Sequence, residues 1–186
     1  GQNNTAEDNS AEVIRVIRYD TNWNRSGAAS ITSNPDLFGG EVRYPFDYGC
    51  VEMTETNGTL YIVTGHEGYV DESVGQGHQG FLMIAVDQAS MTGKIVNCDL
   101  WHSFAKYIKS QSSYLYVLEQ SEGSRCTKLS RYDSTTLNKK TIELLPYGGS
   151  RTSVRALSCY ASVDGMAVSA DSVLCIGTTI DQSQYD

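Results

Sequence analysis

Three acidic side chains lie close together in the segment 66–80, which we expect to be a loop. Glu67, Asp71 and Glu72 could supply the two carboxyl groups of a glycosidase, one of which needs a raised pKa. His66 or His102 could share the acid and base roles. An exposed acidic loop explains the same residues without chemistry, because spacing within a loop does not determine separation in space. A glycoside hydrolase or lyase is therefore an alternative hypothesis, and no catalytic residue is assigned.

The three histidines of the chain could lie on one face of the protein. His66 follows an apolar strand pattern, His78 lies in the loop after it, and His102 begins the next repeat. Three histidines can hold zinc with one open position. Hydrogen-bonding histidines on the surface explain the same pattern, so we expect neither a metal nor a cofactor.

The segment Gly75–Gly80 (GQGHQG) matches the glycine pattern of a dinucleotide-binding turn. That turn must follow a strand and open a helix whose N-terminus holds the pyrophosphate. The residues that follow, Phe81–Val86 (FLMIAV), have the composition of a strand. The sequence therefore predicts a flexible hairpin loop here.

The segment that starts at Asp20 begins like a calcium loop, with Asn22 and Asn24 at its third and fifth positions. An EF-hand loop then needs Gly and Glu where this chain has Arg25 and Ile31, so an EF-hand is excluded. Aspartates follow two other strand patterns in the same way, at Asp87 and Asp133. We expect all three carboxylates to cap the backbone of a turn.

Composition limits the classes of partner. The net charge of −8 and the pI near 4.8 argue against a nucleic-acid backbone. No apolar run approaches the roughly 20 residues of a membrane-spanning helix. The five cysteines include no CxxC pair. We expect them to be small buried side chains, with one or two disulfides as the alternative.

Short apolar runs bounded by turn residues predict an all-β protein. They are Val13–Tyr19, Leu60–Val63, Phe81–Val86, Tyr114–Leu118 and Val173–Ile176. Their apolar character is continuous rather than alternating, which predicts burial on both faces of a sheet.

Two strand types alternate along the chain. One has a leucine near its start (Leu60, Leu115, Leu174), and the other ends in an aspartate (Asp20, Asp87, Asp133). A weaker strand precedes each leucine strand, at Cys50–Thr54, Phe104–Ile108 and Met166–Ser169, and another follows each aspartate, at Ala28–Thr32, Lys94–Cys98 and Lys140–Leu144. Four antiparallel strands per repeat are typical of β-propeller blades. A β-sandwich is the alternative fold, and His102–Ser110 could instead form a helical turn.

The order of the strand types predicts an incomplete propeller: half a blade, two full blades and half a blade. We expect residues 1–12 to be a flexible tail and residues 13–186 a partial propeller domain. Propellers close with four to eight blades, so a second chain, or a missing fragment of the same precursor, should complete this one.

Two segments carry a resemblance to a known group of proteins. Residues 164–179 (DGMAVSADSVLCIGTT), and WHSFAKYI (101–108) followed by YLYVL (114–118), resemble repeats of secreted or cell-surface β-propeller proteins of Gram-positive gut bacteria. The resemblance implies a propeller fold and an extracellular or cell-surface location, with a cytoplasmic location as the alternative. It implies no activity and no functional residue.

The sequence favours a non-catalytic binding or scaffold protein that recognises a protein or a carbohydrate. A purely structural repeat of a larger protein is a further alternative. Aromatic and histidine side chains in loops offer stacking area together with a polar group. The candidate ligand-binding residues are Trp23, His66, Tyr69, His78, Trp101 and His102.

Overall fold

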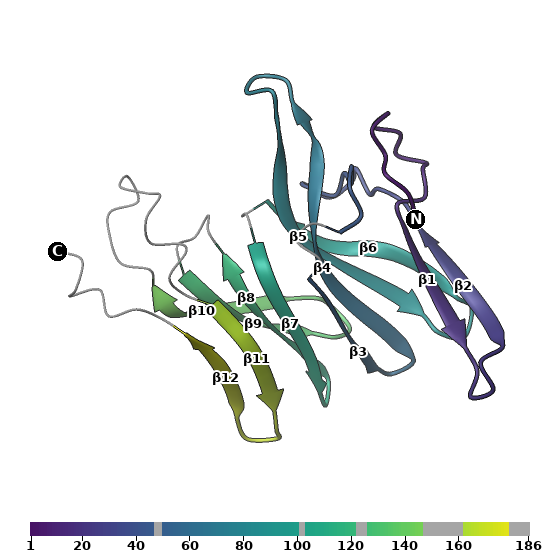
Figure 1. Ribbon diagram of the computed structural model, residues 1–186. Helices are drawn as coiled ribbons and strands as arrows, with labels where there is room; N and C mark the ends of the chain where they lie inside the picture. Colours follow the sequence, from purple (N-terminus) through teal and green to yellow (C-terminus); the bar gives the residue numbers. More distant parts are fainter. Residues whose placement is uncertain (47–49, 101–102, 122–125, 147–161, 179–186) are drawn as a thin grey trace. The chain divides into compact units, whose positions relative to one another are not determined.

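The computed structural model describes residues 1–46, 50–100, 103–121, 126–146 and 162–178. These residues form twelve β-strands in four antiparallel sheets, and none of them lies in a helix (Figure 1). The all-β prediction is confirmed. The chain divides into two compact units, unit 1 (Gly1–Leu100) and unit 2 (Trp101–Asp186), and each is described by itself.

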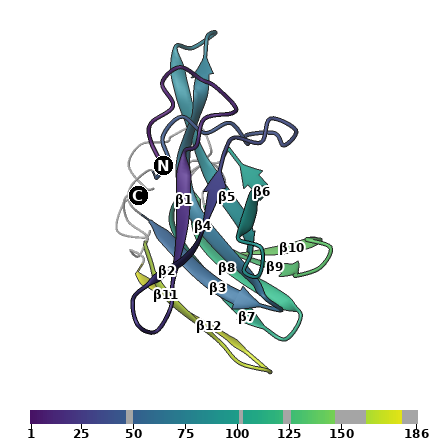
Figure 2. The same cartoon turned by 90° about the vertical axis from the view of Figure 1, so that its right-hand side faces the viewer.

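Unit 1 contains one two-stranded and one four-stranded sheet. The first pairs β1 (Ile14–Tyr19) with β2 (Arg25–Ile31), and the second contains β3 (Val51–Thr56), β4 (Thr59–Asp71), β5 (Gln76–Asp87) and β6 (Thr92–Asp99) in that order. β3 pairs with β4 only as far as Thr64, and β6 pairs with β5 only as far as Phe81. Strands β4 and β5 therefore continue as a two-stranded hairpin, the β4–β5 arm (residues 65–80), which extends beyond the sheet in Figures 1 and 2.

The core of unit 1 lies between its two sheets. Side chains of a strand alternate between faces, so Ile62 and Ile84, which are directly opposite each other, point to the same side. The buried cluster there contains Val13, Ile14, Ala29, Ile31, Val42, Ile62, Leu82, Ile84, Val86 and Ile95. Val63 and Met83, on the other face of the sheet, are also fully buried. The predicted burial on both faces is therefore confirmed for Leu60–Val63 and Phe81–Val86. It is wrong for Val13–Tyr19 and Val173–Ile176, where one face of the strand carries exposed apolar side chains (Ile17, Tyr19, Leu174 and Ile176).

Two kinds of turn join the strands. Asn57 and Gly58 have positive φ and form the two-residue loop between β3 and β4, as a type I′ hairpin requires. The second kind begins at an aspartate: Oδ1 of Asp20 accepts hydrogen bonds from the amides of Asn22 and Asn24, both at 2.8 Å. Oδ1 of Asp87 accepts one from Ser90 N (2.7 Å), and Oδ1 of Asp133 accepts them from Thr135 N (3.0 Å) and Thr136 N (2.8 Å). The predicted capping role of the three aspartates is confirmed.

Unit 2 also contains one four-stranded and one two-stranded sheet, but here the four-stranded sheet comes first along the chain. Its four-stranded sheet contains β7 (Ser103–Gln111), β8 (Tyr114–Ser121), β9 (Cys126–Asp133) and β10 (Lys139–Pro146), and its two-stranded sheet pairs β11 (Ser162–Val168) with β12 (Val173–Thr178). Leu118, Val163 and Met166 form the buried cluster between the two sheets. Tyr116, Leu129, Val173 and Cys175 are among the partly buried side chains packed against it.

Three expectations about local structure need correction. The helical alternative for His102–Ser110 is wrong, because β7 occupies Ser103–Gln111. The expected loop 66–80 is largely strand, because its residues belong to the β4–β5 arm. Leu174 does not occupy the position of Leu60 and Leu115. The hairpin before β12 closes at Ser169 and Ser172, whose N···O distance is 2.9 Å, so Val173 takes that position.

The first twelve residues, for which the sequence suggests a flexible tail, make specific contacts in unit 1. The amide of Asn4 donates to the carbonyl of Arg43 at 2.8 Å, and the Asn4 side chain is buried. The carboxylate of Glu12 is 2.8 Å from Arg15. Hydrogen bonds from Ser30 and Arg15 lower the pKa of Glu12 to about 2.

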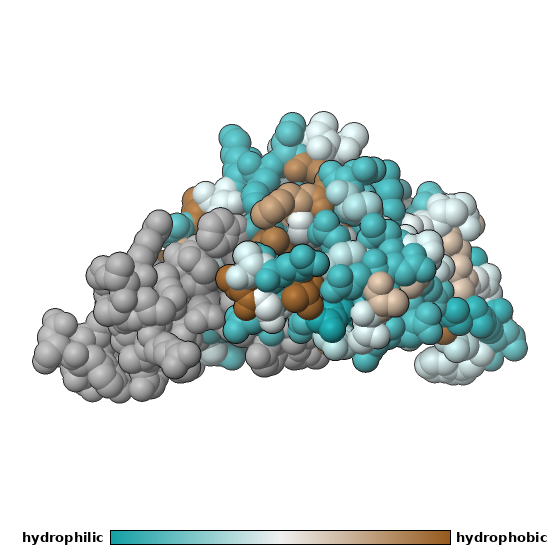
Figure 3. All heavy atoms as spheres, turned by 90° about the horizontal axis from the view of Figure 1, so that it is seen from above, coloured by the Kyte–Doolittle hydropathy of each residue, from teal (hydrophilic) through white to brown (hydrophobic). Residues whose placement is uncertain are grey.

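The surface is largely polar on the side that Figure 3 displays, with small groups of hydrophobic atoms between hydrophilic ones. No helix long and apolar enough to cross a membrane occurs among the described residues.

Candidate functional site

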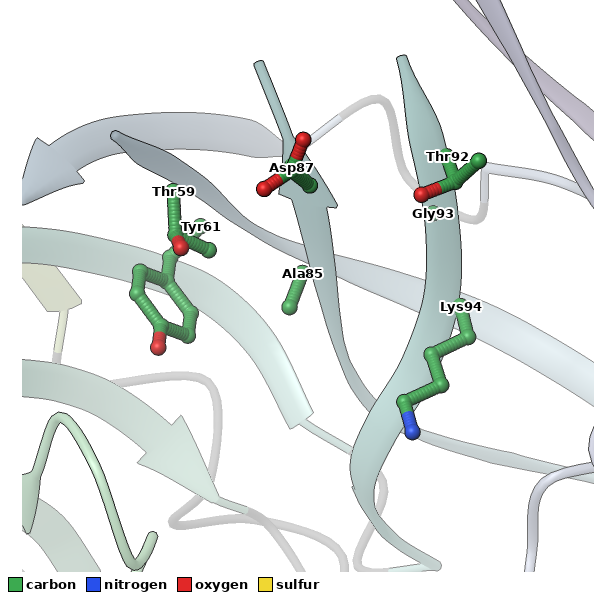
Figure 4. Close-up of a pocket in the computed structure, with 7 residues that line it drawn as sticks. All are labelled: Thr59, Tyr61, Ala85, Asp87, Thr92, Gly93 and Lys94. Carbon is green, nitrogen blue, oxygen red and sulfur yellow. The ribbon is translucent and has the colours of Figure 1, made fainter. Parts of the chain in front are cut away.

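A pocket lies on one face of the four-stranded sheet of unit 1. The strand register places Thr59, Asp87 and Thr92 side by side in one row. The next row on the same face is Tyr61, Ala85 and Lys94. Together with Gly93 these residues line a hollow of about 450 Å³ (Figure 4).

The row formed by Tyr61, Ala85 and Lys94 gives the pocket its depth. Figure 4 shows the short side chain of Ala85 between the ring of Tyr61 and the aliphatic chain of Lys94. Tyr61 is 6% exposed, and this burial raises the pKa of its phenol above the usual value. The hydroxyl therefore stays protonated at neutral pH and can donate a hydrogen bond, whereas the exposed ammonium of Lys94 supplies a positive charge.

The row formed by Thr59, Asp87 and Thr92 supplies oxygen atoms. Oδ1 of Asp87 accepts hydrogen bonds from Ser90 N and Ser90 Oγ, both at 2.7 Å, and these bonds hold the pKa of the carboxyl below its usual range. Ser90 Oγ also lies 2.7 Å from Thr92 Oγ1. Asp87 is therefore an ionised acceptor at neutral pH, held in place by its own turn.

Gly93 connects the pocket to the core of unit 1. A Cβ atom at this position would lie 2.6 Å from Cδ1 of Ile31 and 2.9 Å from Cγ2 of Val86. Both side chains belong to the buried cluster between the two sheets. The missing side chain thus lets β2 pack closely on β6 and keeps Thr92 and Lys94 at their places in the pocket wall.

The pocket is better suited to binding than to acid–base catalysis. Among the described residues that line it, Asp87 supplies the one carboxylate, and its pKa is lowered, whereas a general acid needs a raised pKa. Glycoside hydrolysis needs two carboxyl groups. Hydroxyl groups, one carboxylate, one ammonium and one aromatic ring can together hold a polar ligand by hydrogen bonds and stacking.

The four predicted ligand-binding residues that the structure describes, Trp23, His66, Tyr69 and His78, do not line this pocket. Trp23 is 84% exposed at the Asp20 turn, and His66 is buried with Nε2 3.0 Å from the carbonyl oxygen of Gly39. Nε2 of His78 lies 3.6 Å from the carboxylate of Asp71. Trp101 and His102 lie outside the described residues, and with them the proposed site of three histidines.

Tyr69, another of these candidates, belongs to a hydrogen-bond network along the β4–β5 arm. Its hydroxyl donates to Oδ1 of Asn9 at 2.8 Å and accepts from Nδ2 of Asn4 at 3.1 Å. Ser33 Oγ is 3.4 Å from the same oxygen. These bonds give Tyr69 a structural role, since they connect the arm to the first residues of the chain.

The acidic residues of the arm are each tied to a neighbour or exposed. Glu67 lies 3.8 Å from Arg43, and Glu72 is exposed. Asp71 accepts hydrogen bonds from the hydroxyl (2.6 Å) and amide (2.8 Å) of Ser73, which lower the pKa of its carboxyl. Asp71 therefore lacks the raised pKa of a glycosidase acid. No group of three His, Cys, Asp or Glu that could hold a metal occurs within the described parts of the chain.

The glycine pattern 75–80 has no phosphate-binding geometry. Gly75 lies in the turn of the β4–β5 arm, and β5 begins directly after it at Gln76. A Cβ on Gly77 would lie 2.5 Å from Oε1 of Glu67, so this glycine makes room for a side chain of the opposite strand. The preference for a hairpin over a dinucleotide site is confirmed, although the segment is mostly strand.

Neither a family model, nor a curated protein, nor a solved structure matches this chain. The resemblance to repeats of surface propeller proteins therefore stays a prediction. The case for a function depends on the pocket and on the repeat.

The sequence did contain a signal that could have found the pocket. Tyr61 belongs to a leucine strand, and Asp87 ends the aspartate strand that follows. If the start of the leucine strand is placed opposite the aspartate that ends the next strand, residues an even number of positions from these two ends lie on one face. The expected place for such residues was a loop, because loops carry function more often than the faces of sheets.

Proposed function

We propose that this protein is a non-catalytic binding scaffold of the β-propeller type, and that it binds a carbohydrate in the pocket on strands β4, β5 and β6. The observation that carries the proposal is the pair of adjacent rows, Thr59–Asp87–Thr92 and Tyr61–Ala85–Lys94, on one face.

A carbohydrate fits the chemistry of these two rows. A sugar has one face of C–H groups, which can pack against the ring of Tyr61, and a rim of hydroxyl groups that both donate and accept. Lys94 donates, Asp87 accepts, and the threonine hydroxyls do either. Since the described lining residues include one cation and one anion, they favour a neutral polyhydroxyl ligand over a strongly charged one.

The propeller architecture is supported by the repeat. Each unit has one four-stranded antiparallel sheet whose strands follow one another in chain order, as in a propeller blade. The sheet β1–β2 has the aspartate turn that β5–β6 and β9–β10 also have. The sheet β11–β12 has the tight hairpin of β3–β4 and β7–β8. An extracellular or cell-surface location is part of the same proposal, because surface glycans are accessible there.

The test is a glycan array probed with the full chain, followed by calorimetry on the strongest hit. Lys94→Ala should weaken binding about tenfold or more, because a hydrogen bond to a charged group contributes about 1.5–3 kcal/mol. Lys94 is exposed, so the variant should fold normally. Trp23→Ala is the matched control, since it removes an exposed aromatic side chain that is not in the pocket.

Two results would overturn the proposal. The first is an array without a hit, including the case in which the chain captures only a protein partner. The second is binding that Trp23→Ala abolishes and Lys94→Ala leaves unchanged, which would place the ligand at the residue that the sequence suggested.

A further inference from the structure

The two-stranded sheets of the two units expose apolar side chains in complementary ways. On β1, Ile17 and Tyr19 are 40% and 52% exposed, whereas Val16 packs against the core of unit 1. On β12, Leu174 and Ile176 are 61% and 60% exposed, whereas Cys175 packs against the core of unit 2. Among the described residues, β1 pairs only with β2, and β12 pairs only with β11. Within the part of the chain that the structure describes, each sheet thus has an exposed apolar face and an open edge.

The four-stranded sheets show which strand each open edge lacks. β5 and β9 end in the aspartate turn and pair with β4 and β8, which start after a tight hairpin. β1 ends in the same aspartate turn, at Asp20, and no described strand of the β4 type pairs with it. β12 starts after the same tight hairpin, and no described strand of the β5 type pairs with it.

The register of the missing pair follows from the two complete sheets. In both sheets, the first residue after the two-residue hairpin loop lies opposite the aspartate, as Thr59↔Asp87 and Tyr114↔Asp133. The corresponding residues of the open edges are Ser172 and Asp20. Counting along antiparallel strands then places Cys175 opposite Ile17, and Ile176 opposite Val16.

This register brings like side chains together on both faces. Directly opposite residues lie on the same face. The exposed Ile17 would lie beside Cys175, which packs on the core of unit 2. The exposed Ile176 would lie beside Val16, which packs on the core of unit 1. Each exposed apolar side chain would therefore continue the apolar face with which the sheet of the other unit packs on its own core.

The charges of the two sheets are also complementary. The segment Ile14–Ile31 contains Arg15, Arg18 and Arg25 against one aspartate, and Ser162–Thr178 contains two aspartates and no basic residue. Opposite charges bring two surfaces together faster and disfavour the pairing of like edges. Pairing of β1 with β12 is thus preferred over β1 with β1 or β12 with β12.

We propose that β12 of one copy of this chain pairs with β1 of a second copy. Two copies then form two antiparallel four-stranded sheets of the order β11–β12–β1–β2, and each copy contributes two strands to each sheet. Because the exchange is reciprocal, the assembly closes as a dimer. This assembly depends on the repeat but not on the pocket, so the binding assay and the assembly assay can fail separately.

The register is tested with a new cysteine opposite a native one. Ile17→Cys in the full chain should form a disulfide with Cys175 of the other copy under mild oxidation, because directly opposite Cα atoms of an antiparallel pair lie about 4.5–5.5 Å apart, within the range that a disulfide spans. Non-reducing electrophoresis should show a species of twice the 20.4 kDa chain mass, and peptide mass spectrometry should identify the 17–175 link. Arg18→Cys places the new thiol one residue away and on the other face, so it should form little disulfide with Cys175. Adding Cys175→Ser to Ile17→Cys should abolish the 17–175 link.

The assembly itself is tested by light scattering. The unmodified chain should have twice the monomer mass, and Ile176→Lys should reduce it to the monomer while circular dichroism shows an unchanged fold. Ile142→Lys is the matched control, because Ile142 is 57% exposed on β10 of the same unit and should leave the dimer intact. A monomeric unmodified chain, a 17–175 link found only at monomer mass, or equal effects of the two lysine variants would each overturn the proposal.

Discussion

Asn4 donates a hydrogen bond from Nδ2 to the hydroxyl oxygen of Tyr69, 3.1 Å away, and thereby joins the start of the chain to the β4–β5 arm. The same amide group donates to the carbonyl oxygen of Asp8 at 2.8 Å, and Oδ1 of Asn4 accepts from the amide of Asp8 at 3.0 Å. A buried amide with partners on both sides stabilises the segments that it connects, because each partner would otherwise be left without its bond.

Replacing this amide should destabilise unit 1. Asn4→Ala removes the hydrogen bonds to Asp8 and Tyr69, and we expect the free energy of unfolding to fall by about 1–3 kcal/mol. Urea denaturation of the full chain measures the change. Asn3→Ala is the matched control, because Asn3 is exposed and its loss should change stability by less than about 0.5 kcal/mol. Equal effects of the two substitutions would show that the network around Tyr69 contributes nothing.

Gly93→Ala should destabilise the chain by overpacking. The added Cβ would lie 2.6 Å from Cδ1 of Ile31, and forcing a methyl group into a packed core costs about 1–3 kcal/mol. Thermal unfolding measures the loss. Ile31→Val, which removes that Cδ1 atom, should recover part of the stability in the double variant.

A second glycine in a strand serves as the control for this prediction. A Cβ on Gly165 would meet no atom within 4 Å, so Gly165→Ala should have little effect or stabilise the chain slightly. If Gly93→Ala were as well tolerated as Gly165→Ala, the close packing of β2 on β6 would be wrong.

The thiol of Cys98 should react slowly. Burial, together with the nearby carboxylates of Glu41 and Asp99, raises the pKa of Cys98 to about 11 from a usual value of 9.0, and Sγ lies 3.2 Å from the carbonyl oxygen of Phe38. At pH 8 the thiolate, which is the reactive species, should be about a hundredfold less abundant than in the unfolded chain. Alkylation followed by peptide mass spectrometry should find native Cys98 labelled far more slowly than Cys98 in urea.

The raised pKa of Cys98 also sets the sign of a pH effect. The folded state keeps its proton up to about pH 11, whereas the unfolded chain loses it near 9.0. The folded state is therefore favoured fully below pH 9 and loses this advantage as the pH rises through 11. Cys98→Ser should flatten the decline of stability in this interval, and an unchanged decline would contradict the assigned pKa.

The strands were predictable because each combines a short apolar run with a turn signal. Asp20, Asp87 and Asp133 mark turns by a mechanism that acts within four residues, so no knowledge of the fold was needed to place them. The alignment of Leu174 with Leu60 and Leu115 was wrong by one residue, because the residue types around the hairpin do not show where it closes. The closing pair depends on backbone geometry, which a pattern of residue types does not specify.

The candidate site was less predictable than the strands. None of Thr59, Ala85 and Thr92 is a residue type that suggests chemistry, and the pocket exists only because three strands are aligned in one register. His66 and Tyr69 suggested binding by type, yet their hydrogen bonds serve the interior of unit 1. Residue type alone does not separate a ligand contact from a structural bond, since both use the same donors and acceptors.

The β4–β5 arm extends past both neighbouring strands, and among the described strands only its own two connect the tip to the sheet. Residues 72–75 at this tip are all exposed. Length can therefore change there without altering the register of any other strand. The tip is the place where an epitope or a fluorescent label can be inserted while the core stays intact, and where related chains are free to diverge most in length.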